Sequence, residues 1–282
     1  MKLGLSCIAL KASEQVAAAV LAEELGYDSV WAGEHILLTH RTVVSINPRP
    51  YGPEELMDPF VLLSHLAART SRIRLATGVA LLALRPPIMT ARAVLGVDVL
   101  SKGRFDLGVG VGGFPDEYAA AGANMRTRGA RVDEQLELLD RLFQPGDVEF
   151  EGRFYSLAAT AFEPKPAQRP RPPILIGGWS DAALRRAARW DGWYGVVGDV
   201  ATFKVMKGKM EAFRDEIGRG AAPFQHVLVF HEGMACKGAP SRGELEDFIA
   251  AGVDRVVVTP WGYDYAQGLP RIAAYAQEMG LC

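Results

Sequence analysis

The sequence is poor in cysteine and has no paired cysteine motif. Its three cysteines, Cys7, Cys236 and Cys282, are widely separated among 282 residues, and none stands in a Cys-x-x-Cys or Cys/His spacing. A zinc site or a disulfide framework needs closely spaced ligands or dense cysteines. We therefore expect no metal site and no disulfides, which fits a reducing, cytoplasmic environment.

The chain also lacks an excess of one charge and a long apolar run. Its 31 basic and 33 acidic residues give a formal net charge of -2, which leaves no field to attract nucleic acid or an anionic membrane. No apolar stretch approaches the roughly 18 residues of a membrane span, and residues 1–8 are too short for a signal peptide. We expect a soluble protein whose partner is a small molecule, with no nucleic acid and no membrane partner.

Several catalytic signatures are missing as well. The chain has no nucleophile elbow with a Ser/His/Asp set, no His-Glu-x-x-His and no Walker lysine, so hydrolysis and phosphoryl transfer have no visible machinery. A phosphate-bearing organic cofactor is a simpler explanation for the glycine-rich segments that are present.

Short apolar runs of strand type alternate with segments of helical period, which indicates successive βα units and a parallel sheet. The expected strands are residues 2–7, 29–32, 73–77, 105–109, 174–176, 192–197, 227–234 and 255–259. The expected helices are residues 13–25, 59–70, 88–101, 128–143, 181–190, 202–217, 242–251 and 266–279. Eight such units predict an α/β protein with the (β/α)8 TIM barrel fold.

Helix caps and one irregular segment complete this organisation. We expect N-caps at Ser13, Asp58, Ser180 and Ser241, and helix ends at Gly26 and Gly252. Residues 144–173 hold two strand-like pieces, 148–155 and 160–163, and then a proline-rich run. We interpret this segment as an insertion between the fourth helix and fifth strand, within a single domain of residues 1–282.

A glycine cluster, Gly108-x-Gly110-x-x-Gly113, has the spacing of a dinucleotide-binding fingerprint. It follows the fourth strand rather than the first, leads into Phe114-Pro115, and has no acidic residue closing a βαβ unit about 20 positions on. We therefore do not favour a Rossmann domain. In a barrel these glycines lie at the carboxyl end of a strand, where ligands bind and a bare backbone can approach them closely.

Two other features lie just after predicted strands. Gly177 and Gly178 precede the start of a helix, where backbone N–H groups could cradle a phosphate; a tight βα turn is the alternative. His35, beside Glu34, directly follows the second strand, and its imidazole suits proton donation or a hydrogen bond to a ligand; a structural role is the alternative.

Four segments resemble the bacterial luciferase-like monooxygenase family: Gly26-Tyr-Asp-Ser-Val-Trp-Ala-Gly-Glu-His35, Ile73-Arg-Leu-Ala-Thr-Gly-Val79, Asp98-Val-Leu-Ser-Lys-Gly-Arg-Phe-Asp-Leu-Gly-Val-Gly110 and Pro173-Ile-Leu-Ile-Gly-Gly178. Residues 103–113 and the arginine-rich residues 125–134 are most similar to the branch that uses coenzyme F420, an 8-hydroxy-5-deazaflavin. The resemblance implies a barrel with this insertion, a flavin or deazaflavin at the rim, and a homodimer.

The resemblance also implies roles for individual residues. It places His35 at the reactive face of the ring as the catalytic group, and a cis Gly78–Val79 bond against the ring. The cofactor-binding residues would be Glu34, Thr77, Gly78, Val79, Gly110, Gly112, Gly177 and Gly178, the last two holding the phosphate. Substrate-pocket candidates are Leu37, Phe114, Tyr118 and Trp261, which favour an apolar substrate or, alternatively, pack the barrel mouth.

The sugar-phosphate dehydrogenases of the F420 branch carry an acid where Gly113 stands and a tryptophan where this chain has Ile36-Leu37-Leu38, which argues against a sugar phosphate. The leading hypothesis is an F420-dependent oxidoreductase that transfers a hydride to or from a small organic substrate. The alternatives are an FMN-dependent monooxygenase using reduced flavin and O2, and a non-catalytic flavin-binding barrel.

Overall fold

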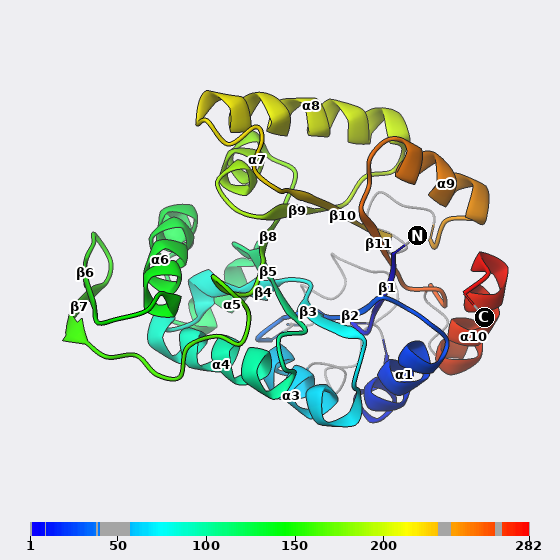
Figure 1. Cartoon of the computed structure of the whole chain (residues 1–282), viewed down its shortest axis with the longest axis horizontal. Helices are drawn as coiled ribbons and strands as arrows, with labels where there is room; N and C mark the ends of the chain where they lie inside the picture. The colour runs from blue at the N-terminus through cyan, green and yellow to red at the C-terminus, as the bar shows by residue number, and fades with distance from the viewer. Residues whose placement is uncertain are drawn as a thin grey trace.

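Eight parallel strands close into a barrel in a computed structural model that describes residues 2–8, 10–37, 39, 57–230, 238–262 and 267–281. The strands pair in chain order, β11 pairs with β1 (Leu3↔Val256), and β3 pairs with β5 (Leu75↔Phe105), so these eight strands form a closed ring. Figure 1 shows the ring of strands inside a ring of helices. The barrel strands are β1 (Leu3–Ser6), β2 (Ser29–Ala32), β3 (Arg74–Thr77), β5 (Phe105–Gly110), β8 (Ile174–Gly177), β9 (Gly192–Gly195), β10 (Gln225–Phe230) and β11 (Arg255–Val258).

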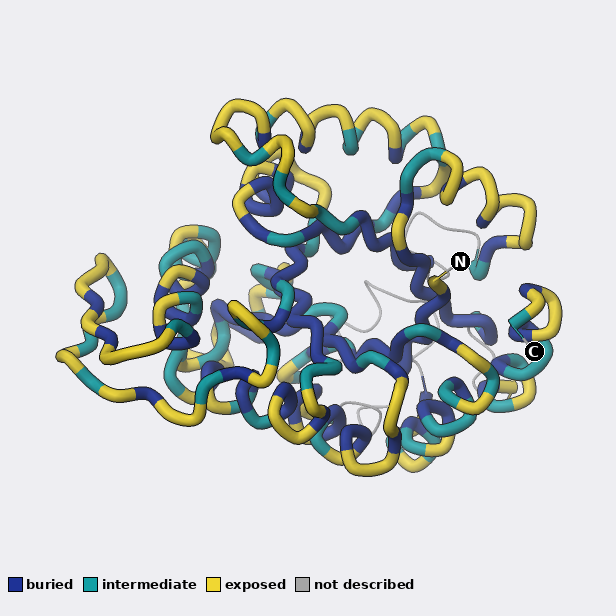
Figure 2. Tube along the Cα trace, viewed as in Figure 1, coloured by how far each residue is buried: buried dark blue, intermediate teal, exposed yellow. Residues whose placement is uncertain are grey.

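The predicted (β/α)8 barrel is therefore confirmed, and its strands form where the apolar runs lie. Every residue of β5 and β11 is buried, as expected for parallel strands covered on both faces. The barrel interior is a separate packed cluster of Trp31, Ala76, Leu175, Tyr194, Val227, Val229 and Val257. Figure 2 shows the buried ring of strands and the exposed outer faces of the helices.

The predicted helices are present with ends shifted by a few residues: α1 (Ala12–Glu24), α3 (Pro59–Arg69), α4 (Pro87–Leu100), α6 (Arg128–Phe143), α7 (Asp181–Ala188), α8 (Val200–Glu216), α9 (Arg242–Ala250) and α10 (Gly268–Met279). Residue 266, the expected start of the last helix, and residues 231–234 of the seventh strand lie outside the described residues. None of the helices in the described ranges is long and apolar enough to cross a membrane.

Three of the four predicted N-caps are confirmed. Asp58, Ser180 and Ser241 each accept hydrogen bonds from the first turn of their helix, and Ser241 forms a capping box with Glu244. The prediction for Ser13 is wrong, because α1 begins at Ala12, a strong helix former, after the uncapped Lys11.

The insertion between α6 and β8 contains an antiparallel hairpin, β6 (Val148–Glu151) and β7 (Ser156–Thr160), which lies outside α6 in Figure 1. The predicted second strand, 160–163, is wrong because the chain already reverses at residues 152–155. Glu134 on α6 holds that turn by accepting hydrogen bonds from the backbone N–H groups of Arg153, Phe154 and Tyr155.

Four short elements were not predicted. A two-residue strand, β4 (Ala80–Leu81), and a 3-10 turn, η2 (Leu82–Leu84), follow β3, while a short helix, α5 (Pro115–Ala120), and a second turn, η3 (Met125–Thr127), follow β5. All four lie in connections that leave the carboxyl ends of strands, which is the end where barrel enzymes carry their sites.

Candidate active site

The predicted site residues lie at one end of the barrel. Glu34 and His35 follow β2, Gly78 and Val79 follow β3, Gly112 and Phe114 follow β5, Gly178 follows β8, and Trp261 follows β11. Because the strands are parallel, their carboxyl ends form one rim, and residues far apart in sequence come together there.

The peptide bond between Gly78 and Val79 is cis, as the resemblance predicted. Beneath it, inside the barrel, the rings of Trp31 and Tyr194 stack with centroids 5.0 Å apart. A Cβ atom on Gly78 would lie 2.8 Å from the Tyr194 hydroxyl oxygen, so this position has room only for glycine. Burial raises the pKa of Tyr194, and its phenol therefore stays protonated near neutral pH.

Glu34 and Thr77 make their hydrogen bonds within the chain. The buried Glu34 carboxylate accepts hydrogen bonds from the Leu81 N–H at 2.6 Å and from Arg85 Nε at 2.7 Å, and Arg85 also pairs with Asp58. The Thr77 hydroxyl donates to the Gly108 carbonyl at 2.7 Å. These bonds tie the connection after β2 to the connection after β3, and β3 to β5, beneath the rim. Arg85 lies 51 positions from Glu34, and a single sequence carries no signal for that pair.

His35 is held by a residue that the sequence analysis missed. Its Nδ1 lies 3.3 Å from Glu117 Oε1, its ring packs on Phe114 with centroids 5.4 Å apart, and its side chain is 22% exposed. Glu117 comes from α5 and is fully buried. The signal that could have revealed this helix is Pro115 at its first position, followed by two acids in its first turn.

The four substrate-pocket candidates differ in exposure. Leu37 and Phe114 are half-buried, whereas Tyr118 and Trp261 are buried. The Tyr118 hydroxyl donates to the Val111 carbonyl, and burial raises the pKa of this phenol to about 12, so Tyr118 packs the loop after β5. Trp261 Nε1 is a buried donor that has no hydrogen-bond partner among the described residues.

The glycine pair after β8 leads into a capped helix. Gly178 has a φ of +120°, which favours glycine, and its carbonyl accepts a hydrogen bond from Trp193 Nε1 at 2.6 Å. Ser180 caps α7 by accepting from the Ala183 N–H at 3.2 Å. The exposed Asp181 in the first turn pairs with Lys209, which offsets its charge. The N-terminus of α7 thus lies beside the rim, as a phosphate cradle requires.

These features define a class of protein: a (β/α)8 barrel enzyme whose glycine-rich rim carries one histidine held by a buried carboxylate. The chain belongs to the luciferase-like monooxygenase family, which matches residues 6–253. The predicted family and enzyme class are therefore confirmed. Among the described residues, no group of three or more His, Cys, Asp or Glu side chains could hold a metal ion.

Individual relatives cover much of the chain. An uncharacterized protein of Mycobacterium tuberculosis is 34% identical over 243 residues, which span 84% of this chain and 81% of the relative. The oxygenase component of flavin-dependent trigonelline monooxygenase from Acinetobacter baylyi is 30% identical over 165 residues, 58% of this chain and 42% of that protein. The structure of an F420-dependent secondary alcohol dehydrogenase with an F420–acetone adduct covers 99% of this chain and 98% of its own, with a TM-score of 0.82 and 16% identity. That similarity shows a shared fold.

Proposed function

We propose that this chain is an F420-dependent oxidoreductase that transfers a hydride between the deazaflavin and a small organic substrate at the carboxyl end of the barrel. The observation that carries the proposal is the position of His35, held by Glu117 on the same rim as the glycine pair before α7. The solved alcohol dehydrogenase, which matches the chain over nearly its whole length, is a complex with F420 and supports this choice.

The rim residues fit a phosphate-bearing ring cofactor. A Cβ atom on Gly113 would meet nothing within 4 Å, so the backbone after β5 borders open space. The buried Nε1 of Trp261, without a partner among the described residues, is a donor that a ligand could satisfy. Gly177, Gly178 and the first turn of α7 would hold the phosphate, while Val79 and Gly112 would border the ring. When bound, F420 supplies two-electron hydride chemistry.

The chain's own part is to position the substrate and to hold a proton. With Nδ1 of His35 directed at Glu117, Nε2 is the ring nitrogen that can exchange a proton with a substrate. Leu37 and Phe114 are half-buried apolar neighbours on the same rim, and they favour an apolar substrate.

Reduced FMN is the second candidate cofactor, because the trigonelline relative is a flavin-dependent monooxygenase. In that case the same glycine cradle would hold the FMN phosphate and the reaction would need O2. The two candidates predict different affinities, so one titration separates them.

The test is a titration of the protein with F420 and with FMN, followed by tryptophan fluorescence, in wild type and two matched variants. Ser180→Asp keeps an N-cap on α7 but adds a negative charge where the phosphate would lie. Ser241→Asp makes the same change on α9. We expect F420 to bind more tightly than FMN, and Ser180→Asp alone to weaken it about tenfold or more, which is about 1.4 kcal/mol. If both variants weakened F420 binding equally, the glycine pair before α7 would not be the phosphate site. If FMN bound more tightly than F420, the monooxygenase would be favoured.

We also propose that the chain forms a homodimer. The neighbouring helices α3 and α4 each expose apolar side chains that a second copy could cover, namely Val61 on α3 and Met89 and Leu100 on α4. Sedimentation should show a dimer that Met89→Lys weakens; a wild-type monomer at micromolar concentration would contradict this.

A further inference from the structure

The short helix α5 fastens two connections at the barrel mouth. Its adjacent acids, Asp116 and Glu117, both reach the segment after β2: Asp116 accepts from the Thr39 hydroxyl at 2.7 Å, and Glu117 accepts from the Ile36 N–H at 2.8 Å. The next residue, Tyr118, is bonded to Val111 after β5. The helix therefore joins the segment that carries His35 to the glycine-rich segment.

The Glu117 carboxylate is unusual among these contacts because it is almost fully buried. Its side chain is 1% exposed, and the described residues place no lysine or arginine within ion-pair distance of it. Oε1 contacts the Ile36 N–H and His35 Nδ1, while Oε2 is buried with no hydrogen-bond partner among the described residues. Burying a carboxylate with so few partners costs free energy, so a fastening role alone is a poor explanation for a glutamate here.

We infer that Glu117 is a positioning residue that sets the tautomer and the orientation of His35. An ionised carboxylate can only accept hydrogen bonds, so the proton of the neutral imidazole must lie on Nδ1 for the 3.3 Å contact to be favourable. Nε2 is then unprotonated and is the nitrogen left to interact with a substrate. A role for Nε2 in a reaction rests on the proposed function, whereas the position of the proton on Nδ1 does not.

The Ile36 contact strengthens the inference. Because the Ile36 N–H already fixes Oε1 at 2.8 Å, the carboxylate cannot turn away without losing a backbone hydrogen bond next to His35. The Phe114 ring packs against the imidazole as well. His35 is therefore held by one polar and one apolar neighbour, both from the segment that includes the start of α5.

A matched pair of variants separates positioning from fastening. Glu117→Gln keeps the size of the side chain and an acceptor for the Ile36 N–H, but removes the charge that requires a donor at Nδ1. Asp116→Asn makes the same change one residue earlier, at an acid bonded to Thr39. If Glu117 only fastens α5, the two variants should behave alike.

The first readout needs no cofactor. Nitrogen NMR of protein labelled at its five histidines, with the His35 signals assigned by their loss in His35→Gln, reports which ring nitrogen is protonated. In the wild type at a pH where the ring is neutral, we expect a protonated Nδ1 and an unprotonated Nε2. Glu117→Gln should shift this balance toward the other tautomer, and Asp116→Asn should not. A wild-type signal with the proton on Nε2 would overturn the inference even if neither variant folded.

The second readout is turnover with the cofactor that the titration identifies. Glu117→Gln should lower kcat about tenfold or more, because a misplaced reacting group loses much of its rate, while the cofactor Kd and the His35 packing stay unchanged. If Asp116→Asn lowered kcat by the same factor, the inference would be wrong and Glu117 would only fasten α5. The expected tautomer in a protein that turns over with neither F420 nor FMN would support the inference and count against the proposed function.

Discussion

The two ends of the barrel use buried polar groups in opposite ways. At the amino-terminal end, Asp106 is fully buried and accepts hydrogen bonds from Arg74 Nε and Arg255 Nη1, both at 3.0 Å, while Arg255 also pairs with Asp28 at 2.6 Å. At the carboxyl end, Glu117 Oε2 and Trp261 Nε1 are buried without partners among the described residues. The network around Asp106 pairs its buried charges within the chain, although His226 Nε2 at the start of β10 also has no hydrogen-bond partner among the described residues. The Glu117 and Trp261 atoms instead lie at the end where a ligand could reach them.

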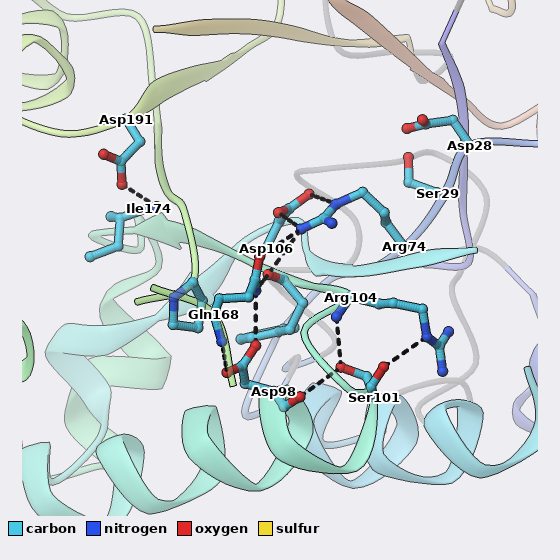
Figure 3. A network of polar contacts seen from close by, with 12 residues as sticks. Asp28, Ser29, Arg74, Asp98, Ser101, Arg104, Asp106, Gln168, Ile174 and Asp191 are labelled. Carbon is cyan, nitrogen blue, oxygen red and sulfur yellow. Dashed lines mark hydrogen bonds and ion pairs between the residues drawn. The ribbon is translucent and has the colours of Figure 1, made fainter. Parts of the chain in front are cut away.

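The same contrast holds in the surroundings of each end. Figure 3 shows the amino-terminal network, in which Asp98 accepts hydrogen bonds from the backbone and side chain of Gln168 and so ties the insertion to the barrel. Arg104 donates to carbonyls of Ala67 and Thr70 at the end of α3. Among the described residues, the carboxyl end instead carries a glycine-rich backbone and one part-exposed histidine, His35. The comparison separates residues that stabilise the fold from those available to a ligand.

The largest expected effect is at the amino-terminal end. Asp106→Asn leaves Arg74 and Arg255 without their shared carboxylate, and removing one partner of a buried ion pair costs about 3–5 kcal/mol. Urea unfolding should show this loss in the free energy of unfolding, while the fraction that stays folded binds cofactor normally.

An exposed ion pair provides the control. Glu216→Gln breaks a pair with Arg185 whose side chains are both more than half exposed, and it should change the free energy of unfolding by less than about 1 kcal/mol. If Asp106→Asn changed the free energy of unfolding as little as this control does, or if it weakened cofactor binding in folded protein, the two ends would not have separate roles in stability and binding.

His35→Ala should have the opposite effects to Asp106→Asn, lowering turnover rather than the free energy of unfolding. The proposed role of His35 in proton exchange predicts a contribution on the order of 10²-fold to turnover, and its part-exposed side chain predicts a small contribution to folding. We therefore expect kcat to fall by about 10²-fold or more, with cofactor Kd and melting temperature nearly unchanged. Normal turnover with a lowered melting temperature would make His35 a packing residue.

The smallest expected effect depends on pH. Burial raises the pKa of Asp58, but hydrogen bonds from Arg85 and from the N–H groups of Val61 and Phe60 outweigh it and hold this pKa below its usual value. A lowered folded-state pKa adds stability that is fully present above the unfolded pKa, about 3.9, and is lost as the pH falls through the folded pKa.

Asp58→Asn keeps the helix cap and removes the charge. Since Asp58 is partly exposed and screened by solvent, the wild type should be more stable than the variant by less than about 1 kcal/mol at pH 7. Urea unfolding at pH 7 and pH 3 should show that the difference in the free energy of unfolding between wild type and variant is smaller at pH 3. A difference that grows below pH 4 would contradict a lowered pKa of Asp58 in the folded state.

The fold was predictable because its signals are local. Each barrel strand is a short apolar run, and the caps at Asp58, Ser180 and Ser241 are adjacent to the helices they begin. The position of His35 and the glycines on the rim followed from the barrel rule that residues after parallel strands share one end. Helix α5 was not predicted because its six residues carry only a proline and two acids as helix-start signals.

The partners of these residues were not predictable, because they lie far apart in the chain. Asp106 and Arg255 are separated by 149 positions, and His35 and Glu117 by 82. Many acidic and basic residues could pair at such distances, and only the folded backbone selects among them. Tyr118 was a substrate-pocket candidate with packing of the barrel mouth as the alternative, and no sequence signal indicated the hydrogen bond that its hydroxyl donates to the Val111 carbonyl.

The most direct test of the two-ended account is amide hydrogen exchange with and without saturating F420. A ligand that binds only the native state slows local opening where it binds. We predict protection of residues 110–114 and 177–181 at the carboxyl end, and unchanged exchange in residues 98–106 and 165–172, which contain Asp98, Asp106 and Gln168 of the amino-terminal network. Protection confined to the amino-terminal end, equal protection at both ends, or no protection at all would contradict the assignment of the carboxyl end as the cofactor site.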